Sequence, residues 1–345
     1  MKITSTTFGQ LHDGSSAELF TLSNDTVTIK ITNYGAIITA IDMPNKNGSI
    51  ENVVCGFDKL ETYISEEYLG SYPYFGAIIG RFGNRIAKGH LEIEGKTYEM
   101  AINNGPNHLH GGLVGFDRKL FTAEIIENEN EVGVKLSYLS PNGEENYPGN
   151  LQVTCIYTLN EACELGIQYY AETDKTTVVN LTNHTYFNLS AQKENILNHE
   201  LELSATKMTE MIEQIPTGKI KPVVGTAYDF SSPRKLGAAG LEMGYDDNFV
   251  LDNQDGELEL AGCLSEAKSG RKVEVYTTQP GMQVYTGYWN PELLIDGQKK
   301  FGSYSGIALE TQHYPDSVNQ PKFPTTLLKP GEKYDQKTVY KFITE

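Results

Sequence analysis

Three histidine-containing segments gather the side chains of this chain that are best suited to acid–base chemistry. The chain has seven histidines, and these segments span residues 107–112, 180–189 and 310–316. Imidazole and carboxylate groups are common general acids and bases in enzymes. The second segment surrounds His184 with Asn, Thr and Tyr, with apolar residues between them. A strand with so polar a face must turn it towards water, a ligand or a fully satisfied hydrogen-bond network.

The spacing of two histidines raises the alternative of a metal site. His108 and His110 lie two positions apart, so on a strand they would point to the same face, as two metal ligands can. A cupin-like site would also need a carboxylate a few residues later, and residues 111–115 contain none. We therefore favour two histidines satisfied within a loop over a metal pair, although that interpretation leaves the adjacent Gly111 and Gly112 unexplained.

Two groups of acidic residues complete the candidate chemistry. Glu310 ends the apolar stretch 307–310, and Asp246 begins a pair of acids in the polar turn 244–248. Taken alone, either acid is more often a solvated or capping residue than a catalytic one.

The sequence does not match three common enzyme motifs. Residues 302–306 carry Tyr304 where a nucleophile elbow needs Ser. Residues 89–97 have one residue too many between their glycines for a phosphate-binding loop. No G-x-G-x-x-G motif follows a predicted strand, so the usual dinucleotide fingerprint is missing.

The elements that must position these residues are predicted to be strands. Apolar and polar residues alternate, which is typical of half-buried strands, over residues 26–32, 91–93, 132–136, 153–159, 257–264, 273–276 and 338–343. One short helix is expected over residues 58–68, with Asp58 as its cap and Glu61 as the capping-box partner. No linker or fixed repeat divides the chain. We predict an all-β, mainly antiparallel fold forming one domain over residues 1–345, with a large β-sandwich favoured over an up-and-down barrel.

Composition and charge limit the partners. With 345 residues and 39% hydrophobic residues, the chain can bury a full core. Its net charge of -17 repels phosphate backbones and anionic lipids, so we expect neither nucleic-acid nor membrane binding. The four cysteines form no C-x-x-C pair, which favours buried thiols in a reducing compartment. Without a signal-like N-terminus or an apolar run of ~18 residues, a cytoplasmic location is expected.

These motifs together resemble those of the aldose 1-epimerase, or galactose mutarotase, family. The match above all involves residues 180–189, which look like the active-site pattern of that family. It extends in family order through residues 80–86, 107–112, 180–189, 244–246, 280–287, 309–312 and 315–321. One departure is Gly83, where the family usually has Ala.

The resemblance implies a fold and a set of roles. The fold would be a single antiparallel β-sandwich whose concave face holds one hexose, without a metal or cofactor. At the matching positions His184 would be the general acid and Glu310 the general base. Tyr186 would lie in the same binding segment, and the sugar would be held by Asn84, Arg85, His110, Asp246 and Gln283. The implied partner is a free aldohexose, with the chain a monomer or homodimer.

The implied reaction agrees with the chemistry of these side chains. Interconverting α and β anomers requires a base that takes the C1 hydroxyl proton and an acid that protonates the ring oxygen. Glu310 must then be ionised while His184 holds a proton, which predicts a bell-shaped pH profile.

Three alternative functions stay open at this point. A sugar-phosphate epimerase would need more cations than the five arginines of the chain suggest. A carbohydrate-binding module could use the 21 tyrosines and Trp289 as platforms without needing both His184 and Glu310. A glycosidase would use two carboxylates, for which Asp246 and Glu310 are conceivable.

Overall fold

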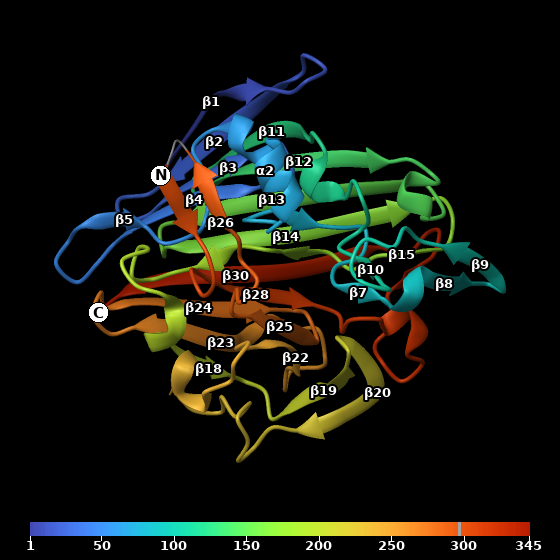
Figure 1. Cartoon of the computed structure of the whole chain (residues 1–345). Coiled ribbons are helices and arrows are strands. Elements are labelled where there is room, and N and C mark those ends of the chain that lie inside the picture. The colour runs from blue at the N-terminus through green and yellow to red at the C-terminus, as the bar shows by residue number, and fades with distance from the viewer. Residues whose placement is uncertain (296–297) are drawn as a thin grey trace.

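Two large antiparallel sheets pack against each other and form the body of the molecule (Figure 1). The computed structural model describes residues 1–295 and 298–345. The larger sheet has nine strands in the order β11 (Thr122–Glu127), β12 (Glu131–Ser140), β13 (Leu151–Asn160), β14 (Glu164–Thr173), β30 (Tyr334–Thr344), β24 (Arg271–Thr277), β23 (Glu259–Glu266), β18 (Glu200–Leu203) and β21 (Arg234–Lys235). The second has six strands in the order β17 (Tyr186–Phe187), β28 (Ile307–Gln312), β25 (Gly281–Tyr285), β22 (Asp246–Val250), β19 (Lys207–Ile212) and β20 (Ile215–Pro222). The predicted all-β sandwich is confirmed.

A third sheet and several short elements complete the fold. The N-terminal strands form a sheet in chain order from β1 (Lys2–Gln10) through β2 (Ser16–Ser23), β3 (Thr28–Thr32) and β4 (Ile38–Pro44) to β5 (Ile50–Asn52). Short pairs join β6 (Ile78–Ile79) to β16 (Thr182–Asn183), β7 (Arg85–Ile86) to β10 (His108–Leu109), β8 (His90–Ile93) to β9 (Lys96–Glu99), β15 (Thr177–Val178) to β29 (Leu327–Leu328), and β26 (Glu292–Ile295) to β27 (Gln298–Phe301). The helices are α1 (Leu60–Tyr63), α2 (Glu66–Ser71) and the 3₁₀ turns η1 (Ala87–Gly89), η2 (Phe116–Arg118), η3 (Glu144–Asn146), η4 (Ile196–Asn198), η5 (Leu236–Ala239) and η6 (Ser317–Asn319).

Alternation along the strands explains how the two large sheets meet. In β13 the buried positions recur every second residue from Leu151 to Leu159, as the apolar–polar period requires. Strand β28 is buried at every position, because one face contributes Ile307 and Leu309 to the core. The other face carries Ala308 into a second apolar cluster and Glu310 into a pocket. The hydroxyl of Tyr340 in β30 donates to the carbonyl oxygen of Leu309 (3.3 Å) across the sandwich.

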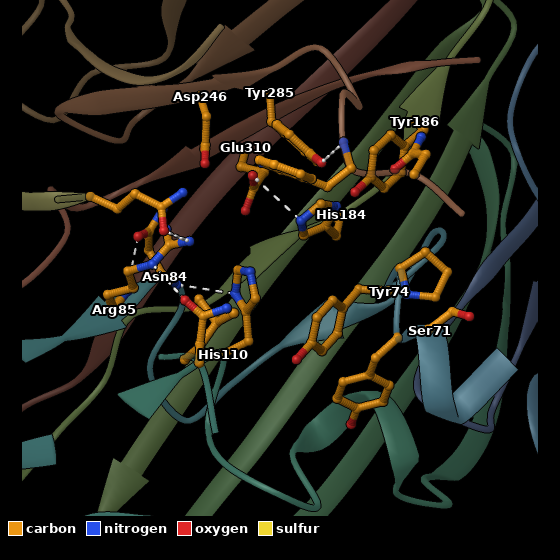
Figure 2. A pocket seen from close by; sticks show the side chains of 17 residues that line it. Ser71, Tyr74, Asn84, Arg85, His110, His184, Tyr186, Asp246, Tyr285 and Glu310 are labelled. Carbon is orange, nitrogen blue, oxygen red and sulfur yellow. Dashed lines mark hydrogen bonds and ion pairs between the residues drawn. The ribbon is translucent and has the colours of Figure 1, made fainter. Parts of the chain in front are cut away.

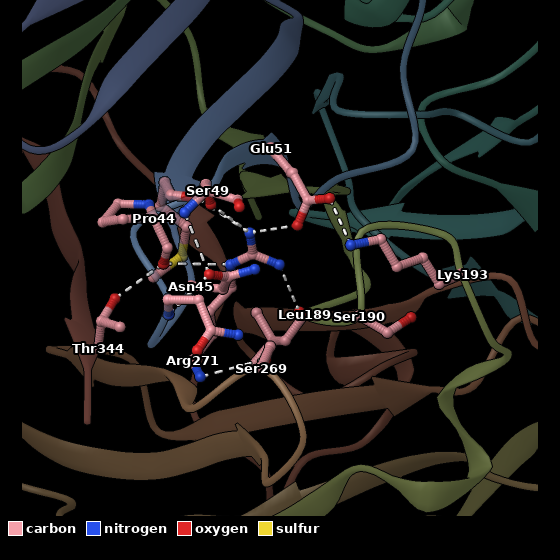
Figure 3. Close-up of polar contacts among 12 residues, drawn as sticks. Pro44, Asn45, Ser49, Glu51, Leu189, Ser190, Lys193, Ser269, Arg271 and Thr344 are labelled. Carbon is pink, nitrogen blue, oxygen red and sulfur yellow. Dashed lines mark hydrogen bonds and ion pairs between the residues drawn. The ribbon is translucent and has the colours of Figure 1, made fainter.

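A buried arginine ties distant parts of the chain together (Figure 3). Arg271, at the start of β24, is 1% exposed. Its guanidinium donates to Glu51 (2.9 Å) and to the carbonyl oxygens of Met43, Pro44, Ser49 and Leu189 at 3.0–3.3 Å. A buried guanidinium is tolerated only when its donors are satisfied, so this network joins the β4–β5 turn to the large sheet.

The expected helix over residues 58–68 is wrong in extent and in its cap. The structure has two short helices instead, α1 and α2, separated by Ile64 and Ser65. The residue before α1 is Lys59, which makes no side-chain capping bond, whereas Ser65 caps α2 by accepting from the backbone N–H of Tyr68 (3.2 Å). The hydroxyl of Ser65 also donates to the carbonyl oxygen of Thr62 (2.8 Å). The same serine therefore bonds the last turn of α1 and caps the start of α2.

None of the helices in the described residues is long and apolar enough to cross a membrane.

Candidate active site

A polar pocket of about 380 Å³ opens beside the six-stranded sheet (Figure 2). Strands β17, β22, β25 and β28 supply Tyr186, Asp246, Tyr285 and Glu310 to its wall. The opposite wall comes from the β7–β10 pair and from the segment after α2. It contains Asn84, Arg85, His110 and residues 71–74. Seven of the eight site residues predicted from the sequence line this pocket. The eighth, Gln283, lies behind it.

Glu310 reaches the pocket because of its register in β28. It pairs with Gln283 of β25, which in turn pairs with Asn248 of β22, so the three polar side chains form a row on one face. The carboxylate of Glu310 is 2% exposed, and its Oε2 has no hydrogen-bond partner within the described residues. Burial, with a contribution from the nearby charge of Asp246, holds the pKa of Glu310 well above its usual range.

His184 lies beside this carboxylate in the pocket. Its Nε2 lies 3.6 Å from Oε1 of Glu310, which is longer than a good hydrogen bond, so both atoms remain available to a bound molecule. The imidazole is 3% exposed and stacks on Tyr186 with 4.8 Å between ring centroids. Burial lowers the pKa of His184 to about 3, so the ring of the free protein is neutral at physiological pH.

A backbone hydrogen bond fixes the role of His110. The N–H of Asn84 donates to Nδ1 of His110 (3.2 Å), so in the neutral ring the hydrogen resides on Nε2. The ring is neutral because burial, with a contribution from the charge of Arg85, holds the pKa of His110 well below its usual range. His110 therefore presents an N–H donor to the pocket.

This assignment bears on the metal alternative. His110, His184 and Glu310 each offer a ligand atom, and these atoms lie within 4.8 Å of one another, a donor set that zinc can use. A metal ligand must offer a free lone pair, however, and Nδ1 of His110 already accepts the Asn84 N–H while Nε2 carries the proton. The hydrogen bonding thus favours a donor to a sugar oxygen over a metal ligand. His108 is not a partner: its Nε2 bonds the hydroxyl of Tyr147 (2.7 Å), outside the pocket.

Arg85 supplies the positive charge of the pocket. Among the described residues that line the pocket, it is the one lysine or arginine. Its Nε donates to Oδ1 of Asn104 (3.0 Å) and one terminal nitrogen donates to Oε1 of Gln214 (2.9 Å). These bonds hold the guanidinium in place. Gln214 comes from the turn between β19 and β20, so a distant hairpin helps to orient this arginine.

Gln283 acts on the pocket through Asp246. Its amide Nε2 donates to Oδ1 of Asp246 (2.7 Å), and its side chain is 1% exposed. It is absent from the pocket lining. The geometry therefore makes Gln283 a support for Asp246.

Several lining residues have no place in the sequence prediction. Tyr285 lies within residues 280–287, one of the segments that resemble the family, so the sequence offered a signal for it. Tyr74, Asn104 and Gln214 belong to no such motif, and the sequence contains no signal for their convergence. The predicted polar strand over residues 180–189 is instead two short strands, β16 and β17, separated by His184 and Thr185, and this break exposes His184 to the pocket.

Comparison with known proteins assigns the family. The family model for aldose 1-epimerase matches residues 18–341. The chain belongs to the aldose 1-epimerase family. It is 45% identical to the galactose mutarotase of Bos taurus, over 99% of both chains. It is 33% identical to the aldose 1-epimerase of Escherichia coli, over 96% of this chain and 97% of that protein.

Solved structures agree with this membership in the aldose 1-epimerase family. The crystal structure of galactose 1-epimerase from Lactobacillus acidophilus superposes with a TM-score of 0.86, at 26% identity and over 99% of both chains. The glycine at position 83 fits the local packing, since an added Cβ would meet Asn180, Thr182 and Gln312 at 3.2 Å. An alanine there needs small shifts of these neighbours.

Proposed function

We propose that this chain is an isomerase that interconverts the α and β anomers of free aldohexoses, with His184 and Glu310 as the acid–base pair. The observation that carries the proposal is the 3.6 Å separation of His184 Nε2 and Glu310 Oε1 at a buried wall of the pocket. Two oxygens attached to one carbon, the C1 hydroxyl and the ring oxygen, can meet such a pair at the same time. Relatives named galactose mutarotase and aldose 1-epimerase support the reaction.

The proposed steps balance within the pair. The carboxylate of Glu310 takes the proton of the C1 hydroxyl, the bond from C1 to the ring oxygen breaks, and His184 gives its proton to that oxygen. The open-chain aldehyde rotates about its C1–C2 bond. Closure on the other face returns both protons by the reverse route, so one pair serves both anomers.

Burial favours the neutral forms of Glu310 and His184 over their charged forms. Ring opening converts a charged pair, carboxylate and imidazolium, into a neutral pair. The raised pKa of Glu310 and the lowered pKa of His184 both favour the neutral pair, so the pocket stabilises the protonation state of the open-chain step. Donors on His110 and Arg85 face the same pocket and are suited to the sugar oxygens.

The lining favours a neutral sugar over a sugar phosphate. Arg85 shares the pocket with the carboxylates of Asp246 and Glu310, and a dianion would be bound by one cation against two acids. The remaining expectations stay predictions: one domain over residues 1–345, a cytoplasmic location, and a monomer or homodimer. The first is supported by a hydrophobic core that contains residues from Phe20 to Phe342.

Two variants test the roles. Glu310→Gln keeps the size of the side chain, and His184→Asn keeps a smaller polar side chain; each removes the acid–base function of its residue. Each should lower turnover about 10²–10⁴-fold, the usual contribution of general acid–base catalysis, with an unchanged circular dichroism spectrum. Turnover within a few-fold of the unmodified protein in either variant would remove that residue from the proposed pair.

A further inference from the structure

The last residue of α2 and the segment that follows it form a wall of the pocket that no sequence motif marks. Ser71, Tyr72, Pro73 and Tyr74 all line the pocket. The backbone of Tyr72 and of Tyr74 is left-handed, with φ of 46° and 58°. A bulky side chain in that region is uncommon and costs free energy, so the surrounding contacts must hold the segment in place.

The ring of Tyr74 lies against both histidines of the site (Figure 2). Its centroid is 4.7 Å from that of His110 in an edge-to-face arrangement and 5.9 Å from that of His184 in a stacked one. The side chain is mostly buried, at 8% exposed. No hydrogen bond involves its hydroxyl within the described residues, whereas Tyr68, the buried tyrosine of α2, uses its hydroxyl to accept the N–H of Phe75 (2.9 Å).

A buried acid holds this wall from behind. The hydroxyl of Tyr72 donates to Oδ2 of Asp117 in η2 (2.8 Å), and the rings of Tyr72 and Tyr74 pack with 4.2 Å between centroids. Asp117 is 6% exposed, lies outside the pocket, and its Oδ1 is unpartnered within the described chain. Burying a carboxylate is costly, which makes a purely incidental contact with Tyr72 a poor explanation.

We propose that Tyr74 is a further substrate-contacting residue, which packs its ring against the sugar and bonds a sugar hydroxyl through its phenol, and that Asp117 positions it through Tyr72. A phenol combines a large apolar ring with one polar group, which suits a pyranose with its C–H bonds and hydroxyls. This inference rests on the proposed function, because the contacted group is the aldohexose of that reaction.

The test compares single-group variants in polarimetric kinetics with D-galactose and D-glucose. Tyr74→Phe removes one hydroxyl and should raise KM about 3–10-fold, as expected for one lost hydrogen bond, with kcat within 3-fold. The matched control is Tyr170→Phe, which changes a half-exposed tyrosine of β14 that does not line the pocket and should leave both constants unchanged. An unchanged KM for Tyr74→Phe would overturn the contact.

The positioning role is tested separately. Tyr72→Phe and Asp117→Leu both remove the tether and should raise KM about 2–5-fold, whereas Asp117→Asn keeps an acceptor oxygen and should restore KM to near the unmodified value. A merely structural tether would lower the melting temperature and leave KM unchanged, which would overturn the positioning role. Tyr72→Phe keeps the test informative if Asp117→Leu does not fold, because it leaves the buried acid in place.

Failure of the proposed function is distinguishable from failure of this inference. If the unmodified protein does not accelerate mutarotation, the proposed reaction is wrong, and calorimetric titration with D-galactose then measures Kd directly. A higher Kd for Tyr74→Phe than for Tyr170→Phe would still support the contact, and equal values would overturn it. An unmodified protein that binds neither sugar would overturn both.

Discussion

Charging His184 in the free protein should be unusually costly. Burial lowers the pKa of its imidazole from 6.5 to about 3. At about 1.4 kcal/mol for each unit of pKa, protonation costs roughly 4–5 kcal/mol more in the pocket than in water. At pH 7 only about one molecule in 10⁴ should then carry the imidazolium in the absence of sugar. Burial also raises the pKa of Glu310, so both shifts disfavour the charged pair in the free protein.

Nuclear magnetic resonance of ¹⁵N-histidine-labelled protein measures this directly. The ring nitrogens of His184, assigned by their loss in His184→Asn, should keep neutral-imidazole shifts from pH 5 to 9. A histidine model peptide in the same buffer gives the reference titration near 6.5. A midpoint between pH 6 and 7 for His184 in the free protein would refute the reasoning from burial. The two pKa values of the bell-shaped pH profile expected for turnover describe the coupled titration of His184 and Glu310. Neither limb of that profile is assigned to one of the two residues.

Three further predictions concern the supports of the site. Arg271→Met should lower the free energy of unfolding by about 3–5 kcal/mol in urea titrations, because the buried contacts to the carbonyl oxygens of Met43 and Leu189 and the ion pair with Glu51 are lost together; a loss below about 1 kcal/mol would contradict the network. Gln283→Met should lower kcat/KM about 3–10-fold by removing the donor to Asp246, and an unchanged value would show that this bond does not orient the acid. Dialysis against EDTA should leave turnover unchanged, because the lone pair of His110 Nδ1 is already engaged, whereas a loss restored by added zinc would contradict that assignment.

The local residue pattern was sufficient to predict the strands, but it was not sufficient to predict the helices. Strands with one face in the core, such as β13, follow the two-residue alternation that the sequence displays. The region 58–68 contains acidic residues near a possible cap, yet the turn at Ser65 divides it. Capping there depends on the hydroxyl of Ser65 meeting Thr62 and Tyr68, which the sequence spacing of Asp58 and Glu61 does not reveal.

The candidate site was predictable where its residues lie in distinctive segments. His184 and Glu310 are 126 positions apart, and only the resemblance to a family brought them together. The convergence of Tyr74 and Gln214 on the pocket depends on the path of the chain after α2 and on the β19–β20 hairpin, which no local pattern encodes. The hydrogen bond from Asn84 to His110 depends on the backbone of two loops, so the tautomer was also outside the reach of sequence reasoning.

Polarimetry on freshly dissolved α-D-galactose, with α-D-glucose beside it, tests the central claim most directly. The account predicts that the folded protein speeds the approach to the same final rotation that each sugar reaches alone, and that Glu310→Gln at equal concentration does not. No acceleration with either sugar, from protein shown to be folded, would contradict the proposed isomerase. A changed final rotation would contradict it too, because a catalyst of anomer interconversion cannot move the equilibrium.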